Sequence, residues 1–370
     1  MYGTSFIRER YLLQHALGLS ALDVGVTAYG IAATFGNLWA VTLSIVWIDG
    51  GRRISPSLTR FWLYACAGIV LYPISPIGGS CVALASLVAA FEYNRQRAAF
   101  RGRQLTTLAA ALAAPAAAIG LWAIFGVDSF AKILAGYILG YLFQSGVATL
   151  IGRHGPRPAD TPGSARRPAS LLWPVLFAAL TQVNGVADRV ILVFVGPGWA
   201  GAGGFAIGLA SAAMLVVVGP LSSEAVAGRL GKQPPRRLVV GICLAGVASA
   251  MLMPSVLPLL ISGSKVAGDN YDKVRNLSIV YMLSVPGSGY WLYRARALQT
   301  GDHMWQYVTM TGVVMLGVHL VVAVPAALTD HVMGVAGGTL LSSYVGAALL
   351  VREKSEPRVA TPGVEPGPPS

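Results

Sequence analysis

Residues 180–226 read LTQVNGVADRVILVFVGPGWAGAGGFAIGLASAAMLVVVGPLSSEAV, two long apolar segments separated by a short turn with two glycines and a proline. A helix needs roughly 20 apolar residues to cross the hydrocarbon core of a bilayer. Each segment reaches that length when the apolar residues that flank it are included. The pattern therefore predicts two membrane-spanning helices, at residues 171–195 and 204–226, that run in opposite directions.

The rest of the chain has the same character. Of its 370 residues, 55% are hydrophobic and only 11% are charged, whereas an ordinary soluble domain carries about 25% charged residues. So few charges cannot cover a water-facing surface, which excludes a soluble enzyme. The sequence predicts an all-α polytopic membrane protein with about eleven transmembrane helices. The expected spans are residues 22–48, 61–75, 77–93, 105–125, 129–151, 171–195, 204–226, 238–261, 276–293, 304–326 and 332–351.

The charges predict how these helices are oriented. The chain carries 27 lysines and arginines against 15 acidic residues, a net charge of +12. Most of the basic residues lie in alternate short loops between the apolar segments, where they mark the cytoplasmic side of a membrane. This placement predicts a multi-pass protein of the inner (plasma) membrane and argues against nucleic acid as a partner. Residue 160 is expected to be cytoplasmic and residue 200 extracytoplasmic.

The first 21 residues do not fit this orientation. The span at 22–48 would begin outside, so that Arg8 and Arg10 would lie on the side that basic residues avoid. Two explanations are open. Either a preceding helix is missing, through a shortened gene start or through genuine loss, or residues 5–20 lie along the membrane interface as an amphipathic segment.

A stretch rich in proline, glycine and arginine divides the chain. Residues 152–170 read GRHGPRPADTPGSARRPAS and have no apolar face, which is typical of a cytoplasmic linker. An N-terminal lobe with five spans, residues 1–151, precedes the linker. A C-terminal lobe with six spans, residues 171–351, follows it, and residues 352–370 are expected to be a disordered cytoplasmic tail.

Short matches relate the two lobes. The sequence RAAFRG at 97–102 resembles RALQTG at 296–301, and AYGIA at 28–32 resembles AIGLA at 206–210. The matches occur in the same order in each lobe. They favour a duplicated transporter of six plus six helices from which the first helix is absent.

The chain has none of the common catalytic signatures. The motifs G-x-x-x-x-G-K-[ST], H-E-x-x-H, C-x-x-C and G-x-S-x-G do not occur in it. We therefore expect no enzyme activity and no cofactor or metal. Transport would draw its energy from an ion gradient, the membrane potential or the gradient of the substrate itself.

Polar residues inside spans are the best functional indicators in such a protein, because each costs a few kcal/mol unless it is paired or hydrated. The densest cluster lies in the first helix of the second lobe. There Gln182 and Arg189 share one helix face, and Asn184 and Asp188 share a neighbouring one. We interpret the cluster as one wall of a substrate-binding cavity. The alternative is that these residues pair with neighbours and only stabilise packing.

Two isolated polar residues extend the candidate site. Asn37 lies in the first predicted span and His319 in the tenth. An isolated polar residue in a span more often bonds a backbone carbonyl than a substrate. We include both as substrate-binding candidates.

The stretch at 180–226 resembles the seventh and eighth helices of the Wzx-type polysaccharide flippases and the lipid II flippases. Both families belong to the multidrug/oligosaccharidyl-lipid/polysaccharide (MOP) exporter superfamily. Their pattern is a polar helix that ends in an aspartate followed by Arg or Lys, a short outer turn with glycine, and a helix that starts small-aromatic-small. Asp188-Arg189, Gly196–Gly198 and Gly204–Ala206 occupy these places. The Arg-rich loop at 94–104 resembles the family's short cytoplasmic loop after the fourth helix.

The resemblance implies a flippase that moves a polyprenyl-pyrophosphate-linked oligosaccharide across the cytoplasmic membrane, for polysaccharide or cell-envelope biosynthesis. Two lobes would give alternating access, with the lipid tail in a lateral groove. Arg189 would be the main cation for the pyrophosphate, and Asp188 its partner or a coupling-cation site. The implied partners are the lipid-linked glycan, membrane lipids and a coupling cation. The small number of intramembrane cations in the first lobe disfavours lipid II itself.

Two other functions stay open. A MATE-like antiporter that exchanges small molecules for a cation would need a titratable acid in its cavity, and Asp188 or Asp23 is available. A degenerate membrane scaffold that no longer transports would explain the missing helix.

Overall fold

The computed structural model of the chain describes residues 5–16, 19–50, 56–100, 104–153, 172–217, 236–261, 265–298 and 304–351. Every regular element within these ranges is an α-helix. The helices of the N-terminal half are α1 (Ser5–His15), α2 (Leu19–Gly50), α3 (Pro56–Leu71), α4 (Pro76–Phe100), α5 (Gln104–Phe125) and α6 (Phe130–Arg153). Those of the C-terminal half are α7 (Leu172–Val193), α8 (Trp199–Val217), α10 (Arg236–Ile261), α11 (Lys265–Leu298), α12 (Met304–Leu328) and α13 (Val332–Val351).

The helix bounds agree with the predicted spans to within a few residues at most places. The helix α11 differs, because it begins at Lys265 rather than near residue 276. Its first turns are polar but still suit a helix, since Arg275 and Asp272 form an i, i+3 ion pair with 3.1 Å between Nη2 and Oδ1. The predicted end of the span at 204–226 lies outside the described residues.

Seven of the described helices are long and apolar enough to cross a membrane, namely α2, α4, α6, α7, α10, α12 and α13. Three more, α3, α5 and α8, contain shorter apolar segments. The chain is therefore a multi-pass membrane protein, as its composition predicts.

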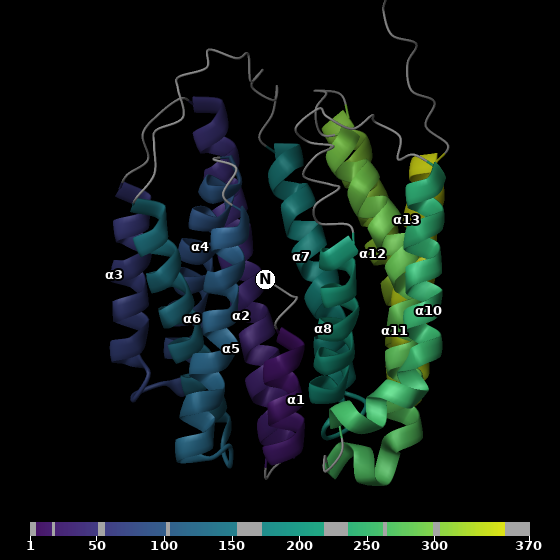
Figure 1. Cartoon of the computed structure of the whole chain (residues 1–370), viewed down its shortest axis with the longest axis horizontal. Coiled ribbons are helices and arrows are strands. Elements are labelled where there is room, and N and C mark those ends of the chain that lie inside the picture. Colours follow the sequence, from purple (N-terminus) through teal and green to yellow (C-terminus); the bar gives the residue numbers. More distant parts are fainter. Residues whose placement is uncertain are drawn as a thin grey trace, which may run out of the picture.

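The helices form two groups that stand side by side (Figure 1). One group contains α2 to α6 and the other contains α7 to α13. The same packing recurs in both: α3 packs on α4 as α10 packs on α11, and α5 on α6 as α12 on α13. Likewise α4 packs on α6 as α11 packs on α13, and α2 on α4 as α8 on α11. The contacts thus pair the helices in the order that a six-plus-six duplication predicts. Residues 154–170 of the expected linker lie outside the described residues.

The helix α1 takes the place of the first helix in the N-terminal group. It packs against α8 and α5, and α7 correspondingly packs against α2 and α12. It lies between the two groups in the lower part of Figure 1. Arg8 and Glu9 of this helix are 1% exposed. One face of α1, with Arg8, Glu9, Leu12 and Leu13, is therefore buried inside the protein, where both charged side chains have partners.

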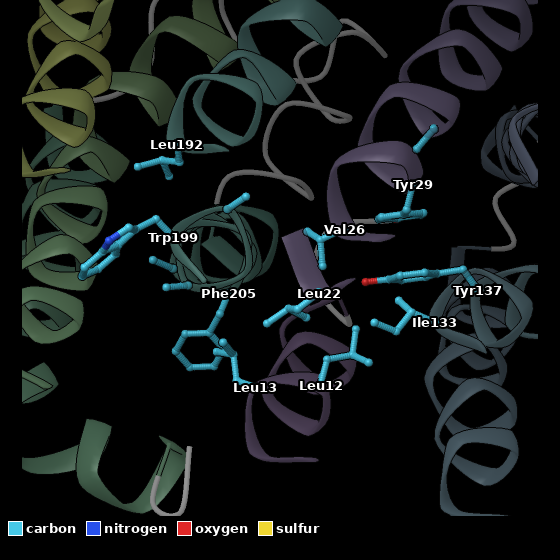
Figure 2. Packing of buried hydrophobic residues seen from close by; sticks show 14 of the residues in the cluster. Leu12, Leu13, Leu22, Val26, Tyr29, Ile133, Tyr137, Leu192, Trp199 and Phe205 are labelled. Atoms are coloured by element: carbon cyan, nitrogen blue, oxygen red, sulfur yellow. The ribbon is translucent and has the colours of Figure 1, made fainter. Parts of the chain in front are cut away.

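The apolar side chains of α1 join both groups to one core. Leu13 points toward Phe205 of α8, whereas Leu12 lies on the side of Ile133 of α6 (Figure 2). Leu22 of α2 lies between them, and all five side chains are buried. This core surrounds the charged residues of α1 and holds them at the contact of the two groups.

Candidate functional site

One face of α2 presents three residues to the C-terminal group. Asp23, Gly30 and Asn37 are spaced by seven, so they lie in a row along the helix. Asp23 accepts hydrogen bonds from the backbone N–H groups of Gly198 at 2.6 Å and Gly201 at 3.0 Å, where α8 begins. A carboxylate is favourable there because unpaired N–H groups and the helix dipole both attract negative charge.

The other two residues of the row contact α7. Asn37 donates from Nδ2 to Oε1 of Gln182 at 3.0 Å. At Gly30 a Cβ atom would lie 2.8 Å from Cγ2 of Val186, so only glycine allows α2 and α7 to approach this closely. The two helices therefore meet over the segment in which the sequence predicted a polar wall.

An ion pair joins α7 to α1. Arg189 donates from Nη2 to Oε1 of Glu9 at 3.0 Å, and these side chains are 4% and 1% exposed. Gly204 of α8 lies beside the pair, with its ideal Cβ position 3.5 Å from Glu9 Cδ and 3.6 Å from Arg189 Cζ. The pair is thus enclosed by α1, α7 and α8.

Arg8 lies in a cage of three tyrosines on the other side of α1. Its Cζ is 5.1 Å from the ring centroids of Tyr29 and Tyr137 and 5.3 Å from that of Tyr141. It donates from Nη2 to the hydroxyl of Tyr29 at 3.1 Å, and the hydroxyls of Tyr29 and Tyr141 are 2.7 Å apart. Cation–π attraction to the three rings therefore compensates part of the charge of Arg8.

Several polar atoms around this cage have no hydrogen-bond partner among the residues that the structure describes. They are Nε and Nη1 of Arg8, the hydroxyl of Tyr137 and Oε2 of Glu9, all of them buried. Buried polar atoms are nearly always satisfied by protein or by ordered water. The centre of the molecule therefore has unused hydrogen-bonding capacity.

Asp188 lies in a different cluster, inside the C-terminal group. Its Oδ1 is 3.2 Å from Nε2 of His319 on α12, and its Oδ2 accepts a hydrogen bond from the hydroxyl of Thr339 on α13. The same hydroxyl is 3.3 Å from Nδ1 of His319. Neighbouring residues of α7 thus serve two clusters, Asp188 within one helix group and Arg189 between the groups.

The structure brings four of the six predicted residues together in two pairs, and it places the other two apart from them. Gln182 bonds Asn37, Asp188 contacts His319, and Arg189 bonds Glu9 rather than relying on Asp188 as its carboxylate. The sixth residue is Asn184, which is half-buried, and within the described part of the chain its Oδ1 has no hydrogen-bond partner.

Sequence reasoning missed six residues of the site, on α1, α2, α6 and α13. They are Arg8, Glu9, Tyr29, Tyr137, Tyr141 and Thr339. For the charges near the N-terminus the sequence left two explanations open, a missing preceding helix and an amphipathic segment along the membrane interface. A signal was present, because Leu12 and Leu13 follow Arg8 and Glu9 at a spacing of four and would bury the same helix face.

Two groups of membrane helices that meet around buried charges define a two-lobed, multi-pass membrane protein. No protein-family model matches the sequence, and no curated protein matches it either. The fold does match solved structures. The lipid II flippase MurJ in an inward closed conformation has 12% sequence identity and a TM-score of 0.68, over 94% of this chain and 84% of MurJ. A MATE transporter in complex with MaL6 has 12% identity and a TM-score of 0.53, over 89% of this chain and 85% of that one.

Both solved structures belong to the superfamily that the stretch at 180–226 resembles. The chain therefore has the fold of the MOP exporter superfamily. This confirms the predicted fold class. At this level of identity the likeness concerns the fold.

Proposed function

We propose that the chain is a transporter that flips a polyprenyl-pyrophosphate-linked oligosaccharide across the cytoplasmic membrane by alternating access, for polysaccharide or cell-envelope biosynthesis. The observation that carries the proposal is the burial of two guanidinium groups, Arg8 and Arg189, where the helix groups meet. Arginine suits a pyrophosphate because its planar fork of donors matches phosphate oxygens. A cation held in the membrane lowers the cost of bringing such an anion across.

The ion pair with Glu9 supports a switching role for Arg189. In the present state Glu9 neutralises Arg189 across the contact of the two groups. Separation of α1 and α7 would break the pair and leave the guanidinium to an anionic substrate. The pyrophosphate would then replace Glu9 as the partner of Arg189, so that the guanidinium would keep a negative counter-charge inside the membrane.

The unused donors beside Arg8 support an anion at the same place. Its Nε and Nη1 and the hydroxyl of Tyr137 are buried, and no described residue forms a hydrogen bond with them. An acceptor-rich ligand such as a phosphate oxygen would satisfy all three. Three tyrosines hold the guanidinium in place, so this cation is positioned before substrate arrives.

A MATE-like cation-coupled antiporter of small molecules is the second candidate. The buried contact of Asp188 with His319 favours it, because exchange of this kind needs a titratable group inside the membrane. Asp23 is less suited, since its two oxygens accept hydrogen bonds from the backbone N–H groups of Gly198 and Gly201 at the start of α8.

The test is a flipping assay in proteoliposomes of the purified protein with a fluorescent polyprenyl-pyrophosphate oligosaccharide. Wild-type protein should expose inner-leaflet substrate to a membrane-impermeant quencher. Arg189→Lys, which keeps the charge, should retain part of the activity, and Arg189→Gln should lose it at an equal reconstituted amount.

Controls separate the alternatives. The same glycan on a neutral polyprenol should not be flipped. Transport of a fluorescent organic cation, assayed in parallel, tests the antiporter function. If the protein moves neither compound, the result would support a membrane scaffold that no longer transports. Undiminished flipping by Arg189→Gln would contradict the proposed role of Arg189.

A further inference from the structure

Two hydrogen-bonded contacts join α2 to the C-terminal group at different depths. Near the end where α8 begins, the Asp23 carboxylate accepts the backbone N–H groups of Gly198 and Gly201. Further along α2, the side-chain amide of Asn37 donates to that of Gln182 on α7. Asp23 and Asn37 are 4% and 5% exposed. Each contact must break if the two helix groups separate at its depth.

Gly30 lies midway between these contacts on α2, seven residues from each. A helix rises about 1.5 Å per residue, so each contact lies about 10 Å along α2 from the glycine. A Cβ atom at Gly30 would lie 2.8 Å from Cγ2 of Val186 and 3.5 Å from Cδ of Arg189. The backbone of α2 therefore rests directly on side chains of α7. Because Arg189 bonds Glu9, their ion pair lies near the same depth, between the two contacts.

We propose that Asp23 with the start of α8 forms the outer gate of the transporter and Asn37 with Gln182 the inner gate, and that α2 rocks on α7 at Gly30 so that the gates open alternately. The outer side is the side of the turn before α8, which the loop charges predict to be extracytoplasmic. The proposal rests on the proposed function only for the purpose of this movement, because the gates do not depend on the nature of the substrate.

The alternation follows from the position of the close contact. The helix α2 runs without a break from Leu19 to Gly50, so it moves as a rod. At Gly30 it has no side chain that would block a tilt against α7. A tilt that separates the helix groups on one side of the contact brings them together on the other side. Both gates can be closed together, as they are here, but only one can open while Gly30 stays on α7.

The two gates differ in strength. The outer gate has two hydrogen bonds to an ionised carboxylate, and such bonds are roughly twice as strong as neutral ones. The dipole at the start of α8 adds to this attraction. The inner gate has one bond between neutral amides, at 3.0 Å. The protein without ligand should therefore open first toward the cytoplasm, the side from which the proposed substrate is supplied.

The first experiment measures both gates without a substrate. The native cysteines are first replaced by alanine, namely Cys66, Cys81 and Cys243. One pair of spin labels is placed at Ile124 and Phe194, at the outer ends of α5 and α7. A second pair is placed at Leu150 and Leu172, at the inner ends of α6 and α7. All four positions are exposed. In pulsed electron spin resonance of the wild type, long inner distances should outnumber long outer distances.

Removal of a gate should open only its own end. Asp23→Ala should raise the ratio of long to short outer distances about tenfold or more, because two hydrogen bonds to a charge are lost. Asn37→Ala should raise the inner ratio about threefold to tenfold, because one neutral bond is lost. Gln182→Ala removes the same bond and should have the same effect. Thr34→Ala is the matched control, since this hydroxyl bonds the carbonyl oxygen of Gly30 within α2, and both ratios should stay as in wild type.

The contact at Gly30 has a test of its own. Gly30→Ala places a methyl group against Val186 and should push α2 away from α7, so that both pairs of distances lengthen. Val186→Ala, added to this variant, removes the two methyl groups in its way and should restore the wild-type distances. A double variant that behaves like Gly30→Ala alone would contradict rocking at this contact.

The outcomes are separable. The alternation would be overturned if outer and inner distances lengthened together in Asp23→Ala or in Asn37→Ala, or if both variants kept the wild-type distances. Wild-type protein in which long outer distances prevail would overturn the order of the gates, and this measurement remains decisive even if a gate variant does not fold. If the gates respond while the flipping assay fails, the gates stand and the proposed substrate is wrong. If flipping succeeds and the distances do not respond, the proposed function stands and the gates are wrong.

Discussion

Arg189 and Glu9 are 180 positions apart in the sequence, and their side chains meet at 3.0 Å inside the protein. The contact joins α7 to α1, the first helix of each group. It compensates a carboxylate and a guanidinium that would each be costly alone in the membrane. It also gives two helix groups a reversible connection at the centre of the molecule.

Removal of either charge should destabilise the protein. Glu9→Gln and Arg189→Gln each leave one buried charge without its partner, which costs about 3–5 kcal/mol. Thermal unfolding of the purified protein in detergent measures the loss. The double variant should lose less free energy of unfolding than the sum of the two single variants, because it leaves no buried charge without a partner.

The exposed ion pair of Lys132 and Asp128 provides the matched control. Its atoms are 2.8 Å apart, but the side chains are 42% and 48% exposed. Asp128→Asn should leave the unfolding temperature unchanged, since water screens the pair. Equal losses from the buried and the exposed pair would contradict the role of burial.

Asp23 should hold α2 to the start of α8. Asp23→Ala leaves the N–H groups of Gly198 and Gly201 without their acceptor, at a cost of about 1–3 kcal/mol. Asp23→Asn keeps one acceptor oxygen and should lose less. Thermal unfolding of the two variants checks the order, and a larger loss in Asp23→Asn would refute this role of the carboxylate.

Gly68 should be essential for the packing of α3 on α4. A Cβ atom there would lie 2.4 Å from the backbone nitrogen of Ala83, whereas at Gly120 of α5 it would meet nothing within 4 Å. Gly68→Ala should therefore reduce the amount of folded protein in the membrane. Gly120→Ala should leave that amount unchanged or higher, because alanine has the higher helix propensity. Similar amounts of folded protein for both variants would show that α3 can shift away from α4 without loss of stability, which would contradict the role of Gly68.

The topology is open to a labelling test. The distribution of basic residues predicts that residue 160 is cytoplasmic and that the turn before α8 is extracytoplasmic. Because Ala200 is buried and Pro197 is exposed, the second cysteine is best placed at position 197. A membrane-impermeant thiol reagent added to intact cells should label position 197 and not position 160. Labelling of both positions from the same side would invalidate the span assignment.

Much of the helical layout could be predicted from the sequence. The turn between α3 and α4 and the bounds of α5, α6, α10 and α13 fall within a few residues of their predicted places. The beginning of α11 could not be predicted in the same way, because its first turns are polar and carry no membrane signal. The position of α1 was also missed, since its charges are compatible with burial only once their partners are known.

Only part of the candidate site could be predicted, because the sequence shows spacing along one helix but not contacts between helices. Spacing along one helix placed Gln182 and Arg189 on a common face, and both contact the N-terminal half in the structure. The partner of each residue lies on a different helix, at a separation of more than 100 positions. No local pattern encodes such a pairing.

The sequence by itself determined that this chain crosses a membrane many times and that polar groups gather in α7. Length, hydrophobicity and the sign of loop charges act locally, so they can be read along the chain. Only the tertiary structure decided that Glu9 neutralises Arg189, that three tyrosines surround Arg8, and that His319 and Thr339 contact Asp188. A charge in a low-dielectric interior is stabilised by whatever lies within a few ångströms of it, and packing between distant helices determines those neighbours.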